Sequence, residues 1–117
     1  MNNILETKSY AFALRIVKLQ KYLHNQHKEF TLSNQVLRSG TAIGALVREA
    51  QYAESKPDFI HKLSIALKEA HETEYWLSLL KDSEYITEND FKSINPEIKE
   101  LLKLLISSIN TSKKSLK

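Results

Sequence analysis

Apolar residues recur along this chain at helical spacing, in four segments separated by short polar links. In the first segment, residues 7–27, one stripe repeats at intervals of four, three and four residues: Phe12, Ile16, Leu19 and Leu23. A second stripe is turned well away from it: Tyr10, Ala13, Leu14 and Val17. A helix in a lone small bundle buries one stripe, so two stripes predict contact with neighbours on more than one side.

The second and third segments, residues 33–53 and 57–81, follow a heptad pattern. Its seam in the second segment is Val36, Gly40, Ile43, Val47 and Ala50. In the third it is Phe59, Leu63, Ala66, Ala70, Thr73, Leu77 and Leu80. Thr31 or Ser33 is expected to cap the second helix, and Pro57 suits the first turn of the third, where its missing N–H is not needed.

The fourth segment, residues 88–113, begins with Thr87 and Asp90 at the spacing of a capping box. Pro96 predicts a break or kink, with Asn95 as a new cap, because proline removes a helical hydrogen bond. Beyond it the segment is apolar nearly all round, which predicts burial on several sides. Four long helices with short links predict an all-α protein, an antiparallel up-and-down four-helix bundle forming a single domain over residues 1–117.

Gly40 and Gly44, both glycines of the chain, lie one turn apart inside the second helix. Each costs roughly 1 kcal/mol relative to alanine there, so a compensating contact is expected. Ser39, Thr41 and the alanines beside them have small side chains, so this face of the helix is not bulky. Another helix can therefore approach closely, either within the bundle or from a second subunit, and both interpretations stay open.

Composition narrows the class of protein. The 117 residues include no cysteine, which excludes disulfides and thiolate metal sites. We find no convincing signal peptide and no apolar run of the ~18 residues that a membrane span needs, so a cytoplasmic location without a membrane partner is expected. The net charge of +3 is uneven, with basic ends and an acidic centre.

The stretch VLRSGTAIGALVREAQYAESKPDFIHKLSIALKEAHETEYWLSLLKDSEYI, with KSYAFALRIVKL in the first helix, resembles the four-helix-bundle family named after proteins encoded in 23S rRNA intervening sequences. The resemblance covers almost the whole chain. Gly44-Ala45-Leu46 and Pro96 depart from the family pattern. The resemblance implies a homopentameric ring and a likeness to the basic accessory protein of diversity-generating retroelements, which is associated with RNA and reverse transcriptase. It implies no established biochemical activity.

Charged residues lie close to the apolar seams of the second and third helices: Arg38, Glu49, Glu69 and Glu72. One interpretation is solvated flanking charge. The other is an ion-paired network that fixes helix register or a subunit interface, since arginine can hold carboxylates through its planar fork. With Ser39, Gly40, Thr41, Gly44 and Trp76, these residues form the predicted packing or oligomer surface.

Few residues of the sequence are candidates for catalysis or metal binding. His24 and His27 lack further ligands, and the spacing of Asp58 and His61 is typical of di-iron bundles, which also need inward carboxylates on other helices. We expect surface histidines, no cofactor, no metal and no enzyme. Trp76, with Tyr75 and Tyr52, is expected to pack in the core or an interface rather than to stack on bases.

Basic residues carry the nucleic-acid hypothesis: Lys8, Arg15, Lys18, Lys21, Lys113, Lys114 and Lys117. In an antiparallel bundle the end of the fourth helix lies near the start of the first, so both groups are expected to meet at one end. A ring would repeat that patch and bind RNA or DNA through many weak phosphate contacts, as an accessory to a nucleoprotein partner. The alternatives are a protein-interaction scaffold without nucleic acid and, least favoured, a metal-dependent enzyme.

Overall fold

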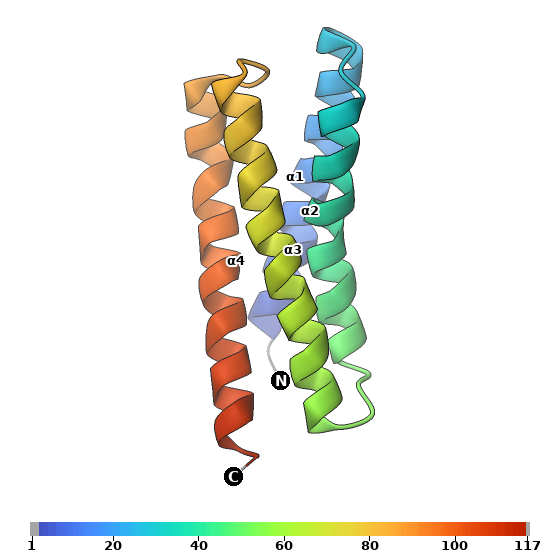
Figure 1. The fold of residues 1–117 in the computed structure, drawn as a ribbon, viewed down its shortest axis with the longest axis vertical. Coiled ribbons are helices and arrows are strands. Elements are labelled where there is room, and N and C mark those ends of the chain that lie inside the picture. Colours follow the sequence, from blue (N-terminus) through green and yellow to red (C-terminus); the bar gives the residue numbers. More distant parts are fainter. Residues whose placement is uncertain (1–2, 117) are drawn as a thin grey trace.

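A computed structural model describes residues 3–116 and places them in four helices. These are α1 (Asn3–His27), α2 (Thr31–Ala50), α3 (Lys56–Asp82) and α4 (Glu88–Lys114). They run alternately up and down in a body of 50 × 21 × 19 Å, so the beginning of α1 and the end of α4 lie at the same end (Figure 1). The predicted all-α four-helix bundle is confirmed.

Helix α2 differs from its prediction at both ends, beginning at Thr31 instead of 33 and ending at Ala50 instead of 53. Neither Thr31 nor Ser33 is the cap. Glu29 takes that role from the preceding link, because its carboxylate accepts hydrogen bonds from the backbone N–H of Leu32 (2.9 Å) and of Ser33 (2.8 Å). A carboxylate two residues before the helix thereby satisfies two free donors of the first turn.

The starts of α3 and α4 follow their sequence signals. The Ser55 hydroxyl accepts from the backbone N–H of Asp58 at 3.2 Å, with Pro57 in the first turn. Thr87 and Asp90 form both hydrogen bonds of a capping box. The expected break at Pro96 is wrong, since α4 is a single helix from Glu88 to Lys114 and Asn95 begins no new helix.

The core confirms most of the predicted seams. In α2 every seam residue from Val36 to Ala50 is buried, and in α1 Phe12, Ile16 and Leu23 are fully enclosed. The seam of α3 is buried except at its start, where Ile60 packs inward and Phe59 is half-buried. The shift by one residue lies in the first turn, where the helix meets the α2–α3 link.

Some apolar surface remains outside the core. In the second stripe of α1, Tyr10 and Leu14 are 57% and 50% exposed, while Ala13 and Val17 are half-buried. Helix α4 buries Leu101, Leu102, Leu105 and Ile109, whereas Ile106 is 43% exposed, so its burial does not extend to that face. Within residues 3–116, no helix combines the length and hydropathy that crossing a membrane requires.

The helices do not pack evenly. Helix α2 packs closely on α1 and α3, and α3 packs closely on α4, whereas α1 and α4 share the smallest contact. The bundle is therefore least closed along the α1–α4 seam. That seam and the α2–α3 surface hold most of the polar residues discussed next.

Candidate functional site

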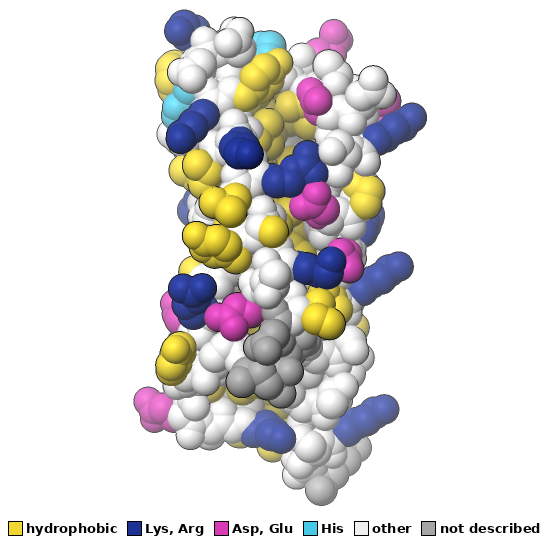
Figure 2. Space-filling view, turned by 180° about the vertical axis from the view of Figure 1, so that it is seen from behind, with side chains coloured by type: hydrophobic (Ala, Val, Ile, Leu, Met, Phe, Trp, Pro, Cys, Tyr) yellow, Lys and Arg dark blue, Asp and Glu magenta, His cyan; other side chains and the backbone are white. Residues whose placement is uncertain are grey.

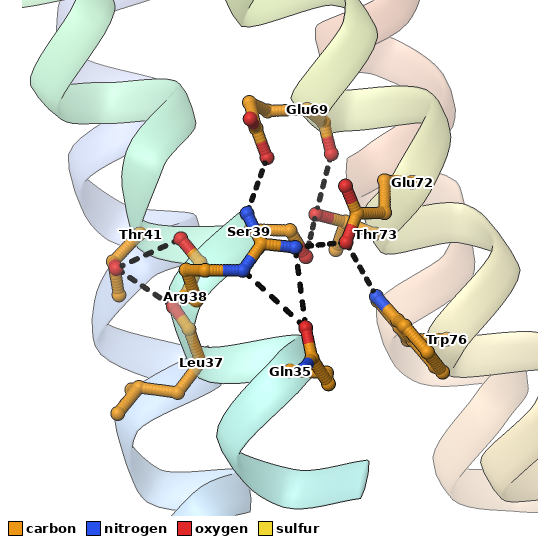
Figure 3. Close-up of polar contacts among 9 residues, drawn as sticks. All are labelled: Gln35, Leu37, Arg38, Ser39, Thr41, Glu69, Glu72, Thr73 and Trp76. Atoms are coloured by element: carbon orange, nitrogen blue, oxygen red, sulfur yellow. Dashed lines mark hydrogen bonds and ion pairs between the residues drawn. The ribbon is translucent and has the colours of Figure 1, made fainter.

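Arg38 joins α2 to α3 at the bundle surface (Figure 3). Its Nη1 donates to Glu69 Oε1 at 3.2 Å, and its Nη2 donates to Glu72. Gln35, one turn before it, accepts from Nε and Nη2 at 3.3 Å. One guanidinium thus spans two carboxylates, each on a different turn of α3.

The Arg38 cluster is neither buried nor fully solvated. The Arg38 side chain is 50% exposed, while Glu69 and Glu72 are 21% and 35% exposed. Glu72 also accepts a 2.9 Å hydrogen bond from the indole Nε1 of Trp76, whose ring packs edge-on against Tyr75. Trp76 is half-buried and held by this bond, so its indole N–H is already used within the chain.

Glu49 does not belong to this cluster. It pairs with Lys62 at 3.4 Å, and its side chain is largely exposed. The expectation that Glu49 joins Arg38 is wrong because Glu49 lies about three turns further along α2, roughly 16 Å away along the axis.

A buried hydroxyl pair lies on the core side of the same two helices. Thr73 Oγ1 lies 2.9 Å from Ser39 Oγ, and both side chains are fully enclosed. Thr73 also bonds the Glu69 carbonyl of its own helix at 2.8 Å. Thr41 is different, since its hydroxyl bonds only carbonyls of α2, that of Leu37 at 2.7 Å being the shorter. The buried hydrogen bond between Ser39 and Thr73 therefore favours one axial register of α2 against α3.

The two glycines allow α1 to approach α2 within one chain. A Cβ added to Gly40 would lie 2.8 Å from Ile16 Cγ1, and one added to Gly44 would lie 3.3 Å from the carbonyl oxygen of Ser9. Gly40 is buried between these helices and offers no surface to another subunit. Gly44 is half-buried and also borders an open groove between α1 and α2.

Two of the basic residues proposed for nucleic acid are already paired across the α1–α4 seam. Lys8 pairs with Glu100 at 3.3 Å, and Arg15 pairs with Glu97. Arg15 also donates to the carbonyl of Ser93 (3.2 Å) and to its hydroxyl (3.0 Å). These contacts surround Pro96, where the helix lacks one N–H donor. The sequence alone does not predict these contacts of Arg15, because no local pattern links it to residues 93–97.

The remaining basic residues form two separate groups. Lys18 and Lys21 are exposed, and no ion pair to either is formed within residues 3–116. Lys113 and Lys114 are exposed at the end of α4, and Lys117 lies outside the described residues. Because Lys8 pairs with Glu100, α4 continues about 20 Å beyond the level of Lys8 to reach Lys113. The expectation that both groups meet at one end is therefore wrong for Lys18 and Lys21, which lie toward the opposite end.

His24 and His27 are engaged in local contacts. His27 Nε2 lies 3.1 Å from the Tyr22 hydroxyl, and the His24 ring packs on Phe30 with centroids 4.7 Å apart. Asp58 accepts from the backbone N–H of Glu54 at 3.2 Å, which is a helix-start contact. In the part of the chain that the structure describes, no three His, Cys, Asp or Glu residues gather as metal ligands would.

Comparisons with known proteins agree on one family. The family model of the 23S rRNA-intervening sequence protein matches residues 1–107. A crystal structure from Bacteroides thetaiotaomicron, described as a protein of unknown function from the S23 ribosomal protein family, is 59% identical to this chain. It superposes with a TM-score of 0.89 over 90% of this chain and 97% of that chain. No curated protein matches this chain. With the family pattern matched over nearly its whole length and the fold shared with that structure, this chain belongs to the 23S rRNA-intervening sequence protein family.

Proposed function

We propose that this protein is a non-enzymatic, self-associating bundle, a homopentamer, that binds RNA or DNA through exposed lysines as an accessory to a nucleoprotein. The observation that carries the proposal is the apolar surface left outside a complete core. Tyr10 and Leu14 remain half-exposed although every helix already buries a seam. Contiguous exposed apolar surface of this kind is typical of association sites.

The surface that we assign to self-association is the open groove between α1 and α2. Its floor is formed by Ala13, Gly44 and Ala45, and its volume is about 410 Å³. Tyr10 and Arg48 border it, with the guanidinium carbon 6.0 Å from the ring centroid. A shallow apolar floor with a charged edge suits an apolar side chain from a neighbouring subunit, with polar contacts at the rim.

Native mass spectrometry of Ala45→Glu tests this assignment. Ala45 is exposed in the single chain, so the charge should leave the fold intact and weaken assembly. Ala11→Glu is the matched control, because Ala11 is also an exposed helical alanine and does not line the groove. Sedimentation of the unaltered protein as a stable single chain at micromolar concentration would overturn the self-association proposal.

The nucleic-acid part of the proposal rests on Lys18 and Lys21. They lie three residues apart on α1, about 4.5 Å along the axis, and neither ammonium is paired with a carboxylate of residues 3–116. A ring would present this pair once per subunit, which multiplies weak phosphate contacts without adding base readout. Binding is therefore expected to depend strongly on salt and little on sequence.

Titration with a structured RNA at several salt concentrations tests the lysines. The double variant Lys18→Gln, Lys21→Gln should bind more weakly and show a shallower dependence of log affinity on log salt, by about one for each phosphate that is no longer neutralised. A matched double variant, Lys68→Gln with Lys103→Gln, removes two other exposed lysines and should bind as the unaltered protein does. Absence of binding by the unaltered protein at low salt would leave the protein-interaction scaffold as the function.

A further inference from the structure

Tyr22, near the end of α1, carries an aromatic ring that is held in place at the bundle surface. Tyr22 is 41% exposed, and its hydroxyl lies 3.1 Å from His27 Nε2. The His27 ring packs edge-on with the Tyr22 ring, at a centroid distance of 5.3 Å. It packs in the same way with Tyr85 of the α3–α4 link, at 5.5 Å. These contacts order the Tyr22 ring and leave part of it open to solvent.

Two lysines without carboxylate partners lie beside this ring. Lys18 precedes Lys21 by three residues and Tyr22 by four, so the three side chains form one surface patch on α1, which we call the Tyr22 patch. Neither ammonium is paired with a carboxylate of residues 3–116. Helix α1 adds no competing negative charge here, because the sequence has no Asp or Glu between Lys8 and Lys28.

The acidic side chains at this end of the bundle lie on the other side of the patch. Glu29 uses its carboxylate to cap α2. Asp90 borders the groove between α1 and α4 from the α4 side and takes part in the capping box of that helix. Glu84 and Glu88 are exposed in the α3–α4 link and at the start of α4. In the upper half of Figure 2 the acidic side chains lie on the right, whereas the left carries basic and histidine side chains without acidic ones. A polyanion is therefore expected to lie along α1 and to avoid the start of α4.

We propose that the Tyr22 patch binds an unpaired nucleotide of a single strand, with the base stacked on the Tyr22 ring and the neighbouring phosphates against Lys18 and Lys21. This inference rests on the nucleic-acid part of the proposed function and adds the form of nucleic acid that the site takes. An aromatic ring accepts any base, because every base has a π-face, but bases inside a duplex are covered by their stacked neighbours. Since His27 already orders the ring, stacking costs little side-chain entropy.

Tyr75 provides a contrast within the same chain. It is 60% exposed and packs edge-on with Trp76, at a centroid distance of 5.1 Å. Lys99 lines the same hollow between α3 and α4, and its ammonium is paired with Glu74. A tyrosine ring is thus available at both places, but the lysine beside Tyr75 is already neutralised.

Fluorescence anisotropy of the full chain at low salt tests the site with three labelled oligomers of about ten units: oligouridine, its deoxy counterpart and an abasic ribose-phosphate chain. The abasic chain has the same phosphates without bases. Oligouridine should bind at least about fivefold more tightly than the abasic chain, and the deoxy strand should bind like oligouridine, because stacking uses the base and not the 2′-hydroxyl. Equal affinity for oligouridine and the abasic chain, or a strict need for the 2′-hydroxyl, would overturn the stacking contact and leave the phosphate contacts of the proposed function in place. No binding of any oligomer would overturn both.

Variants of the two tyrosines identify the ring that stacks. Tyr22→Leu should weaken oligouridine binding about fivefold and leave binding of the abasic chain unchanged, because only the π-face is removed. Tyr22→Phe keeps the ring and should retain most of the affinity. Tyr75→Leu, the matched control, should bind as the unaltered protein does, and urea unfolding checks that each variant is folded. Oligouridine bound equally well by Tyr22→Leu and the unaltered protein would contradict the assignment to Tyr22.

Discussion

Replacing Gly40 by alanine tests why a costly glycine lies inside α2. The added Cβ would lie 2.8 Å from Cγ1 and 3.0 Å from Cγ2 of Ile16. Real Cβ atoms essentially never come as close as 2.8 Å, and both contacting atoms sit on the branched root of the side chain. Because Ile16 is fully enclosed, it has no free space into which to rotate. The substitution must push α1 away from α2.

Two opposing terms set the magnitude. Alanine gains about 1 kcal/mol over glycine in a helix interior, while overpacking a tight core costs about 1–3 kcal/mol. We therefore expect Gly40→Ala to lower the free energy of unfolding by about 1 kcal/mol. At Gly44 the added Cβ would meet the Ser9 carbonyl oxygen at 3.3 Å, which a shift of a few tenths of an ångström relieves. Gly44→Ala is therefore expected to be nearly neutral.

Urea unfolding followed by circular dichroism measures these differences, at one fixed protomer concentration because assembly is linked to stability. Measuring Gly40→Ala in a chain that also carries Ile16→Ala tests whether the contact with Ile16 is the cause of the destabilisation. With the Ile16 branch removed, the clash disappears, and Gly40→Ala should then stabilise the chain by about 1 kcal/mol. A Gly40→Ala chain more stable than the unaltered protein would refute the close-packing explanation. So would a Gly40→Ala effect that is the same with and without the Ile16 side chain.

Three further substitutions probe the contacts between helices. Pro96→Ala should raise the free energy of unfolding by about 1–3 kcal/mol, because it restores an N–H donor inside α4; a lower midpoint in urea would contradict this. Arg15→Gln should lower the free energy of unfolding by about 0.5–1 kcal/mol at low salt, a small amount because Arg15 and Glu97 are both partly exposed. Amide hydrogen exchange at residues 93–97 should become faster, because Arg15 contacts Ser93 and Glu97. Unchanged exchange there would show that Arg15 does not stabilise this part of α4. Thr73→Val should lower the free energy of unfolding by about 1–2 kcal/mol, because it leaves the buried Ser39 hydroxyl without its partner. Thr41→Val should cost less in the same urea assay, because the Thr41 hydroxyl is half-buried and bonds only its own helix.

Local periodicity was enough to predict the four helices and most of their inward faces. The spacing of Val36, Ile43 and Val47 places them on one side of α2 whatever packs there, because helical periodicity depends only on neighbours along the chain. The capping box of Thr87 and Asp90 was predictable for the same reason, since donor and acceptor are three residues apart.

The pairing of residues that are distant in the chain depends on how the helices pack against one another. Arg15 lies beside the turn around Pro96, and Glu49 pairs with Lys62 instead of joining Arg38. Lys113 lies about 20 Å beyond the level of Lys8 because packing sets the axial offset of α1 and α4, and no residue pattern within one helix encodes that offset. A polar side chain on a helix surface can reach several partners of similar energy, so its choice follows from how the cores fit together.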